Sequence, residues 1–72
     1  MKPLLEPAVL KRVAERVSEL RSSRKWTQKI LAERSRLPRT YIADLEGARR
    51  NPSLRTLIRV ANAFGVQIQD LF

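Results

Sequence analysis

The sequence contains no cysteine and no histidine. Without cysteine, neither a disulfide framework nor a thiolate metal site can form. Without histidine, the chain lacks the most common general base and the most common metal ligand. With two glycines in all, it also has no glycine-rich phosphate loop, and no pair of carboxylates is placed to converge. We therefore expect no metal, no cofactor and no enzymatic activity.

Long apolar runs are missing as well. No stretch approaches the roughly 18–20 apolar residues of a membrane span. Residues Met1 to Glu6 do not follow the basic-then-apolar plan of a signal peptide. We therefore expect a cytoplasmic protein with no membrane association.

Acidic residues are few. Lys and Arg number 15 against 7 Asp and Glu, which gives a net charge of +8. Seven of the basic residues lie between Arg21 and Arg39, where the one acid is Glu33. Such an imbalance favours a polyanionic partner such as nucleic acid. Aromatic residues make up 6% of the chain, so the interleaved aromatic platform of many RNA-binding proteins is missing and DNA is the better candidate.

Helical spacing dominates the N-terminal part of the chain. Pro7 suits the first turn of a helix, because its missing N–H is not needed there. After it, apolar residues recur at intervals of three and four positions, as in an amphipathic helix; they are Leu10, Val13, Val17 and Leu20. We expect this helix to end near Ser22 or Ser23. Residues 1–6 are then an N-terminal extension.

A pair of short helices follows. Thr27 is a good N-cap for a helix over residues 28–34. Pro38 disfavours a helical conformation of the residue before it, so the chain breaks there and a second short helix runs over residues 39–46. Two short helices joined by a tight turn in a basic stretch are typical of a DNA-reading helix-turn-helix, here at about residues 27–46.

The C-terminal part adds two more elements. Ser53 caps a helix over residues 54–64, which Gly65 ends. Residues 69–72 begin a short fifth helix. No segment alternates with a period of two for long enough to indicate a strand. We expect a single all-α domain over residues 1–72, a compact bundle of five short helices.

The geometry of a helix-turn-helix assigns roles to its residues, because the second helix enters the major groove while the first lies across the DNA backbone. Ala32 is the small residue where the two helices approach. The apolar residues that set their angle are Leu31, Leu37, Ile42 and Leu45. The residues that lie off the apolar side of the second helix, and so face outward, are Arg39, Thr40, Ala43 and Asp44.

From Leu20 to Phe72 the sequence resembles the phage-repressor (Cro-type, xenobiotic-response-element) helix-turn-helix family. The matching stretches are LR from Leu20, WTQKILAERSRL from Trp26, RTYIADLEG from Arg39, RRNPSLRTLIRVANAFGV from Arg49 and DLF from Asp70. The RTYI run beside RNPSL is most similar to the small controller regulators of restriction–modification systems. The resemblance implies a lambda-repressor-like bundle that binds double-stranded DNA as a homodimer, in the cytoplasm of a bacterial or phage-infected cell.

The resemblance places the outward residues at base edges. Arg39 either bonds bidentately to a guanine or contacts a phosphate. Thr40 can meet a thymine methyl or a polar base edge, and Ala43 is small enough to permit close approach. Asp44 either accepts from a cytosine amino group, or orients Arg39 or Thr40, or repels wrong sites.

The phosphate contacts that the resemblance implies are Thr27, Gln28, Tyr41, Arg49, Arg50 and Asn51. Gln28 and the free N–H groups at the start of its helix can hold a phosphate. Tyr41 is either a core residue or a contact through its hydroxyl. The last three residues follow the recognition helix and would clamp the backbone.

Four further residues have structural roles. Arg21 and Glu46 each sit at the edge of an apolar stripe, and the resemblance implies a partly buried ion pair between them that bridges the first and third helices. Leu71 and Phe72 are candidates for the dimer contact. For Leu71, packing onto its own core is the other interpretation.

The chain departs from the family around the recognition helix. Arg36 and Ala48 stand where glycine is usual, and Pro38 replaces the usual capping residue. A left-handed Arg36 would carry strain of about 1–2 kcal/mol, and the missing cap is worth about 1 kcal/mol. These departures put the local angle of the helix in question, and not the fold.

The expected function is a sequence-specific transcriptional regulator, a repressor or autoregulator that reads a near-palindromic operator as a dimer. No small-molecule ligand is expected. The alternative is an antitoxin-type protein-binding partner that carries the same DNA-binding domain. An antitoxin needs an extra segment to cover a toxin, and the spare residues here are chiefly Met1 to Glu6.

Overall fold

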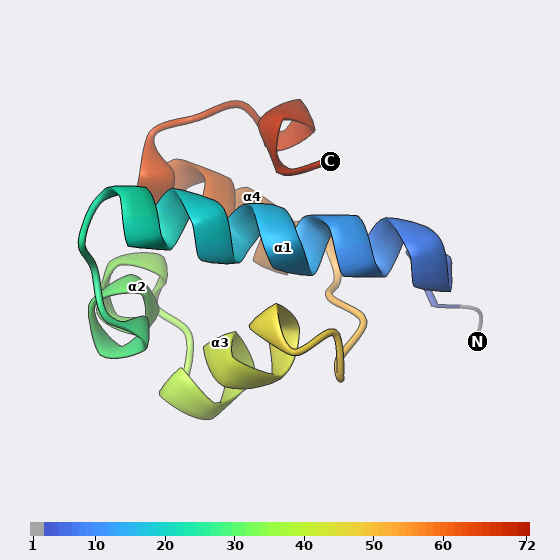
Figure 1. Ribbon diagram of the computed structural model, residues 1–72, viewed down its shortest axis with the longest axis horizontal. Helices are drawn as coiled ribbons and strands as arrows, with labels where there is room; N and C mark the ends of the chain where they lie inside the picture. Colours follow the sequence, from blue (N-terminus) through green and yellow to red (C-terminus); the bar gives the residue numbers. More distant parts are fainter. Residues whose placement is uncertain (1–2) are drawn as a thin grey trace.

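The computed structural model describes residues 3–72, which form four α-helices and one short 3-10 helix (Figure 1). The elements in chain order are α1 (Pro7–Ser23), α2 (Gln28–Ser35), α3 (Arg39–Glu46), α4 (Leu54–Phe64) and η1 (Ile68–Leu71). No strand occurs in this range. The all-α class and the bundle of short helices are thereby confirmed. Met1 and Lys2, which belong to the expected N-terminal extension, lie outside the described residues.

α1 runs across the middle of the view in Figure 1. The helix-turn-helix pair, α2 and α3, lies on one side of α1, and η1 with the C-terminus lies on the other. α2 packs against both α3 and α4, α1 packs against α3, and η1 packs onto α4 and α1. The recognition helix is therefore held by α1 and α2 along its inner side.

One apolar core joins all five elements. Its fully buried side chains are Val13, Val17, Leu31, Ile42, Leu45, Leu57, Val60 and Leu71. Burial of each such aliphatic side chain contributes about 1.5–3 kcal/mol. Because every element supplies at least one of them, the core fixes the helices relative to one another.

Local signals set the helix boundaries close to where the sequence places them. The Thr27 hydroxyl accepts from the Ile30 N–H at 3.1 Å, and Ser53 accepts from the Thr56 N–H at 3.2 Å. α4 ends at Gly65, which has φ +71°. α2 runs one residue further than expected, to Ser35. The last helix starts at Ile68 rather than residue 69 and is a single 3-10 turn.

Arg36 and Ala48, two of the three residues that depart from the family pattern, take strained backbone conformations. Arg36 follows α2 with φ +59° and ψ +41°, and Ala48 follows α3 with φ +55°. A side chain in this left-handed region costs about 1–2 kcal/mol. Pro38 is the N-cap of α3 and provides no side-chain cap. α3 nevertheless spans Arg39–Glu46 as expected, because its core contacts outweigh these local losses.

None of the helices in the described part of the chain has both the length and the hydrophobicity that crossing a membrane requires.

Candidate nucleic-acid interface

The outer face of α3 is open. Ile42 and Leu45 are fully buried on the inner side of the helix. On the opposite side, Arg39 and Thr40 are exposed and Ala43 is partly exposed. The structure thus brings Arg39, Thr40 and Ala43 to one surface that the chain itself leaves open.

The turn before α3 is fixed from within. The Ser35 hydroxyl is buried and donates to the Leu31 carbonyl oxygen at 2.6 Å. The left-handed Arg36 directs the N–H of Leu37 back to the Ala32 carbonyl oxygen at 3.0 Å. Ala32 itself is buried, as its role at the helix–helix contact requires. The angle between α2 and α3 is therefore determined by buried contacts.

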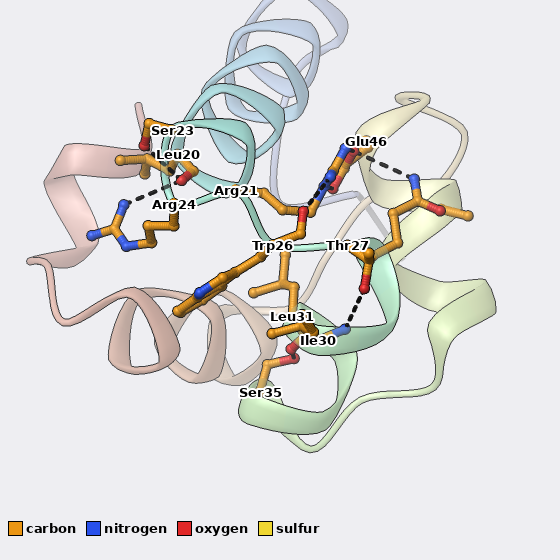
Figure 2. Close-up of polar contacts among 12 residues, drawn as sticks. Leu20, Arg21, Ser23, Arg24, Trp26, Thr27, Ile30, Leu31, Ser35 and Glu46 are labelled. Atoms are coloured by element: carbon orange, nitrogen blue, oxygen red, sulfur yellow. Dashed lines mark hydrogen bonds and ion pairs between the residues drawn. The ribbon is translucent and has the colours of Figure 1, made fainter.

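An ion pair ties α3 to α1. Arg21 Nε donates to Glu46 Oε2 at 2.7 Å, and Arg21 Nη2 donates to Glu46 Oε1 at 3.0 Å (Figure 2). Arg21 Nη1 also donates to the Trp26 carbonyl oxygen at 2.7 Å. The hydrogen bonds that Arg21 donates to the Glu46 carboxylate raise the pKa of Arg21, although burial acts in the opposite direction. The structure thus contains the expected bridge between the first and third helices.

The start of α2 is capped by its own chain. Thr27 uses its hydroxyl as the N-cap (Figure 2). The side-chain amide of Gln28 donates to Glu46 Oε1 at 3.4 Å. Gln28 is thereby held beside the Arg21–Glu46 pair, with its backbone at the N-terminus of α2.

The two arginines after α3 gather on one carboxylate. Asp44 forms ion pairs with Arg49 and Arg50, and the Arg50 guanidinium lies over the ring of Tyr41. In the described chain both carboxylate oxygens of Asp44 face the arginines of the following loop rather than Arg39 or Thr40. Its expected role toward these two residues stays a prediction.

The Asn51 side chain makes two hydrogen bonds to the backbone of Leu5. Its side-chain oxygen accepts from the Leu5 N–H at 3.0 Å, and its side-chain nitrogen donates to the Leu5 carbonyl oxygen at 2.6 Å. Both ends of the amide are therefore used to hold the N-terminal segment. The expected contact of Asn51 with a phosphate stays a prediction, and it would compete with these two bonds. No sequence signal reveals the contact with Leu5, because the partner lies 46 positions away.

Leu71 requires a correction. Its side chain is fully buried in the core, so it packs onto its own chain and is not available for a dimer contact. Phe72 remains 44% exposed, beside the acidic and basic residues on the outer side of α1.

Sequence reasoning missed a set of stacked cations and rings. Arg24 lies 5.0 Å from the Phe64 ring centre and donates to the Phe64 carbonyl oxygen at 2.8 Å. Phe64 stacks on Trp26 at 5.6 Å, and Arg34 lies 4.6 Å from the Trp26 ring. These contacts account for part of the basic stretch as structural. The sequence signal for these contacts was the position of Arg24 and Trp26, close together in the segment between α1 and α2.

The comparisons with known proteins agree with this geometry. A helix-turn-helix family model matches residues 17–71. The immunity repressor protein of Bacillus phage phi105 is 50% identical over 59 residues, which are 82% of this chain and 41% of the repressor. The chain thus spans less than half the length of that relative.

Two solved structures match nearly the whole fold. The restriction-modification controller protein C.AhdI from Aeromonas hydrophila superposes with a TM-score of 0.87 at 34% identity, covering 90% of this chain and 98% of C.AhdI. The controller C.Esp1396I, solved as a tetramer in complex with its natural 35 base-pair operator, superposes with a TM-score of 0.79 at 27% identity, covering 88% of this chain and 93% of that protein. With sequence, fold and motif in agreement, this chain belongs to the helix-turn-helix family, together with these repressors and controllers.

Proposed function

We propose that this chain is a sequence-specific, double-stranded DNA-binding transcriptional regulator that acts as a homodimer. The open outer face of α3 carries the proposal, because a rigid helix with free polar side chains fits the major groove of DNA. The net charge of +8 adds attraction to the phosphate backbone. The C.Esp1396I complex with its operator is the precedent for this fold on DNA.

Base reading falls to the first turns of α3. Arg39 is exposed at the N-terminal end of the helix, where a guanidinium can reach O6 and N7 of a guanine. Thr40 offers a methyl group and a hydroxyl beside it. Ala43, one turn further along, lets the helix approach the bases closely. We propose that these three side chains contribute to the base preference of each half-site.

Phosphate contacts flank that face. The N-terminus of α2, at Thr27 and Gln28, offers backbone N–H groups and the positive end of the helix dipole. At the other end of α3, Arg49 and Arg50 are exposed, and the Arg50 guanidinium lies over the ring of Tyr41. We propose that these two groups bind phosphates on either side of the groove and so position α3.

The dimer contact is proposed at the C-terminal side of the molecule. Leu54 and Ile58 on α4 are 56% and 43% exposed, and Phe72 is exposed as well. Apolar side chains of this size in water favour a self-complementary contact. Two recognition helices would then lie about 34–36 Å apart and read a near-palindromic site.

The two other functions have less support. For the antitoxin, Leu5 in the N-terminal extension is buried in the core and held by Asn51, so this part of the described chain is not free to cover a partner. An enzymatic role finds no support in the relatives, whose names are those of a repressor and of controllers. Co-purification of an unrelated protein would favour the antitoxin.

The direct test is a selection of random duplexes by the purified chain at several salt concentrations. We expect an enriched site with two-fold symmetry. A steep salt dependence with no enriched sequence would show generic charge attraction and would overturn the proposal.

A further inference from the structure

The two arginines that follow α3 fold back onto it. Arg49 Nε lies 3.4 Å from Asp44 Oδ1, and Arg49 Nη2 donates to the Ala43 carbonyl oxygen at 3.2 Å. Arg50 Nε lies 3.9 Å from Asp44 Oδ2, and its guanidinium lies 4.6 Å from the centre of the Tyr41 ring. One carboxylate thus offers one oxygen to each of two guanidinium groups, as a phosphate of the DNA backbone would.

Gly47 makes room for this arrangement. A Cβ atom at this position would overlap the Arg49 guanidinium. The backbone of Gly47 has φ −86°, a value that any residue adopts. It is therefore the returning side chain of Arg49, and not a backbone requirement, that favours glycine here.

The ion pairs stay in contact with water. The exposed fraction is 63% for the Arg49 side chain, 50% for Arg50 and 38% for Asp44. Ion pairs this exposed are weak, so their partners exchange readily. A phosphate that approaches the end of α3 can take both arginines from Asp44. The Asp44 carboxylate is then left without a partner beside the negatively charged DNA. Repulsion between the two lowers the affinity of the protein for that DNA.

We propose that Asp44 is a specificity-determining residue that competes with DNA phosphates for Arg49 and Arg50. Because Asp44 lies on α3, a base that presents an amino group, cytosine or adenine, can donate to the released carboxylate. At an operator, this hydrogen bond offsets the loss of the two ion pairs that Asp44 made with the arginines. On other DNA the loss is uncompensated, so Asp44 weakens non-operator binding more than operator binding. This inference rests on the proposed function.

The test compares Asp44→Asn with Glu19→Gln. Glu19 on α1 forms a similarly exposed pair with Arg16, at 3.5 Å, so the two variants change the net charge equally. Affinity is measured for the selected operator and for a non-operator duplex over a salt series. We expect Asp44→Asn to raise non-operator affinity several-fold, with a salt slope steeper by about 0.9, since one more net charge meets phosphate. Operator affinity rises less or falls, so the ratio of the two affinities falls.

Two further variants locate the effect. Gly47→Ala displaces Arg49 from Asp44 and should shift non-operator affinity in the same direction as Asp44→Asn, but by less. In an Arg49→Gln/Arg50→Gln background, Asp44→Asn should change the affinity ratio by less than it does in the wild-type background, because only the contact of the carboxylate with the base then remains.

Three results would overturn the inference. One is an equal effect of Glu19→Gln, and another is an undiminished effect of Asp44→Asn in the double-glutamine background. The third is an equal rise of operator and non-operator affinity in Asp44→Asn. A wild-type chain that prefers no duplex would overturn the proposed function itself, whereas a clear operator with an unchanged ratio in Asp44→Asn overturns this inference alone.

Discussion

Arg21 and Glu46 form a two-bond ion pair that joins α1 to the last turn of α3. Only 18% of the Arg21 side chain and 7% of the Glu46 side chain are exposed. The third bond of Arg21, to the Trp26 carbonyl oxygen, adds the connection between α1 and α2 to the same cluster. The tilt of the recognition helix therefore depends on a charge pair as well as on apolar packing.

Glu46→Gln should destabilise the fold, because it leaves the Arg21 charge without its partner. We expect a loss of about 2–3 kcal/mol, less than the roughly 3–5 kcal/mol of a fully buried pair, since Arg21 keeps some access to water. Urea unfolding measures it. The double variant Arg21→Met/Glu46→Leu should recover much of the loss. A single-variant loss under about 0.5 kcal/mol would mean that the pair behaves as an exposed one.

Ala48→Gly should stabilise the fold, because Ala48 has φ +55°. Relief of about 1–2 kcal/mol of left-handed strain outweighs the roughly 0.5–1 kcal/mol that glycine adds in conformational entropy. Arg36→Gly should act in the same direction at φ +59°. Thermal unfolding checks both, with Ala63→Gly inside α4 as a control that should lose about 1 kcal/mol. If Ala48→Gly and Ala63→Gly destabilised the fold equally, the backbone strain assigned to Ala48 would be contradicted.

Arg39→Ala and Arg49→Ala should weaken DNA binding in different ways. If Arg39 bonds to a guanine, its loss relaxes base preference at one position of each half-site and costs about 1–3 kcal/mol. Arg49→Ala should lower affinity for operator and non-operator duplexes without relaxing base preference at any single position, and reduce the salt slope by about 1. Repeating the duplex selection and the salt series with each variant separates the two. A uniform loss in Arg39→Ala would make Arg39 a phosphate contact.

Asn51→Ala should act on stability rather than on the DNA contact. It removes two hydrogen bonds to the Leu5 backbone and leaves those backbone groups unpaired, so we expect a loss of about 1–3 kcal/mol. The salt slope of DNA binding should stay unchanged. Asn51→Asp, which keeps the acceptor for the Leu5 N–H, should lose less. A reduced salt slope in Asn51→Ala would support Asn51 as a phosphate contact.

Ile58→Asp combined with Phe72→Asp should give a monomer. A charge at each exposed apolar position opposes burial of that surface between two copies, while the core keeps all its residues. Analytical ultracentrifugation over a range of protein concentrations measures the change in oligomeric state. Operator affinity should fall as the dimer is lost. Leu4→Asp is the control, because Leu4 is 54% exposed at the other end of the chain. An unchanged dimer in the double variant would place the contact elsewhere.

Much of this structure follows from local signals. Pro7, Thr27, Ser53 and Gly65 set helix boundaries through bonds and backbone angles within a few residues of themselves. The spacing of apolar residues identified the buried faces of α1, α2 and α3, because helical geometry repeats every 3.6 residues. In α4 it included Ile58, which is exposed. These signals were sufficient to find the helix-turn-helix and the outer face of α3.

Tertiary structure decided the partners of the polar residues. The amide of Asn51 bonds to Leu5 because the α3–α4 loop passes the N-terminal segment, and no local pattern encodes that approach. Leu71 became core because η1 folds back onto α1 and α4. Asp44 meets Arg49 and Arg50 because the left-handed Ala48 turns the chain back over Gly47. Helix formation is governed by neighbours in sequence, whereas the partner of a side chain depends on which distant backbone the packed core brings within reach.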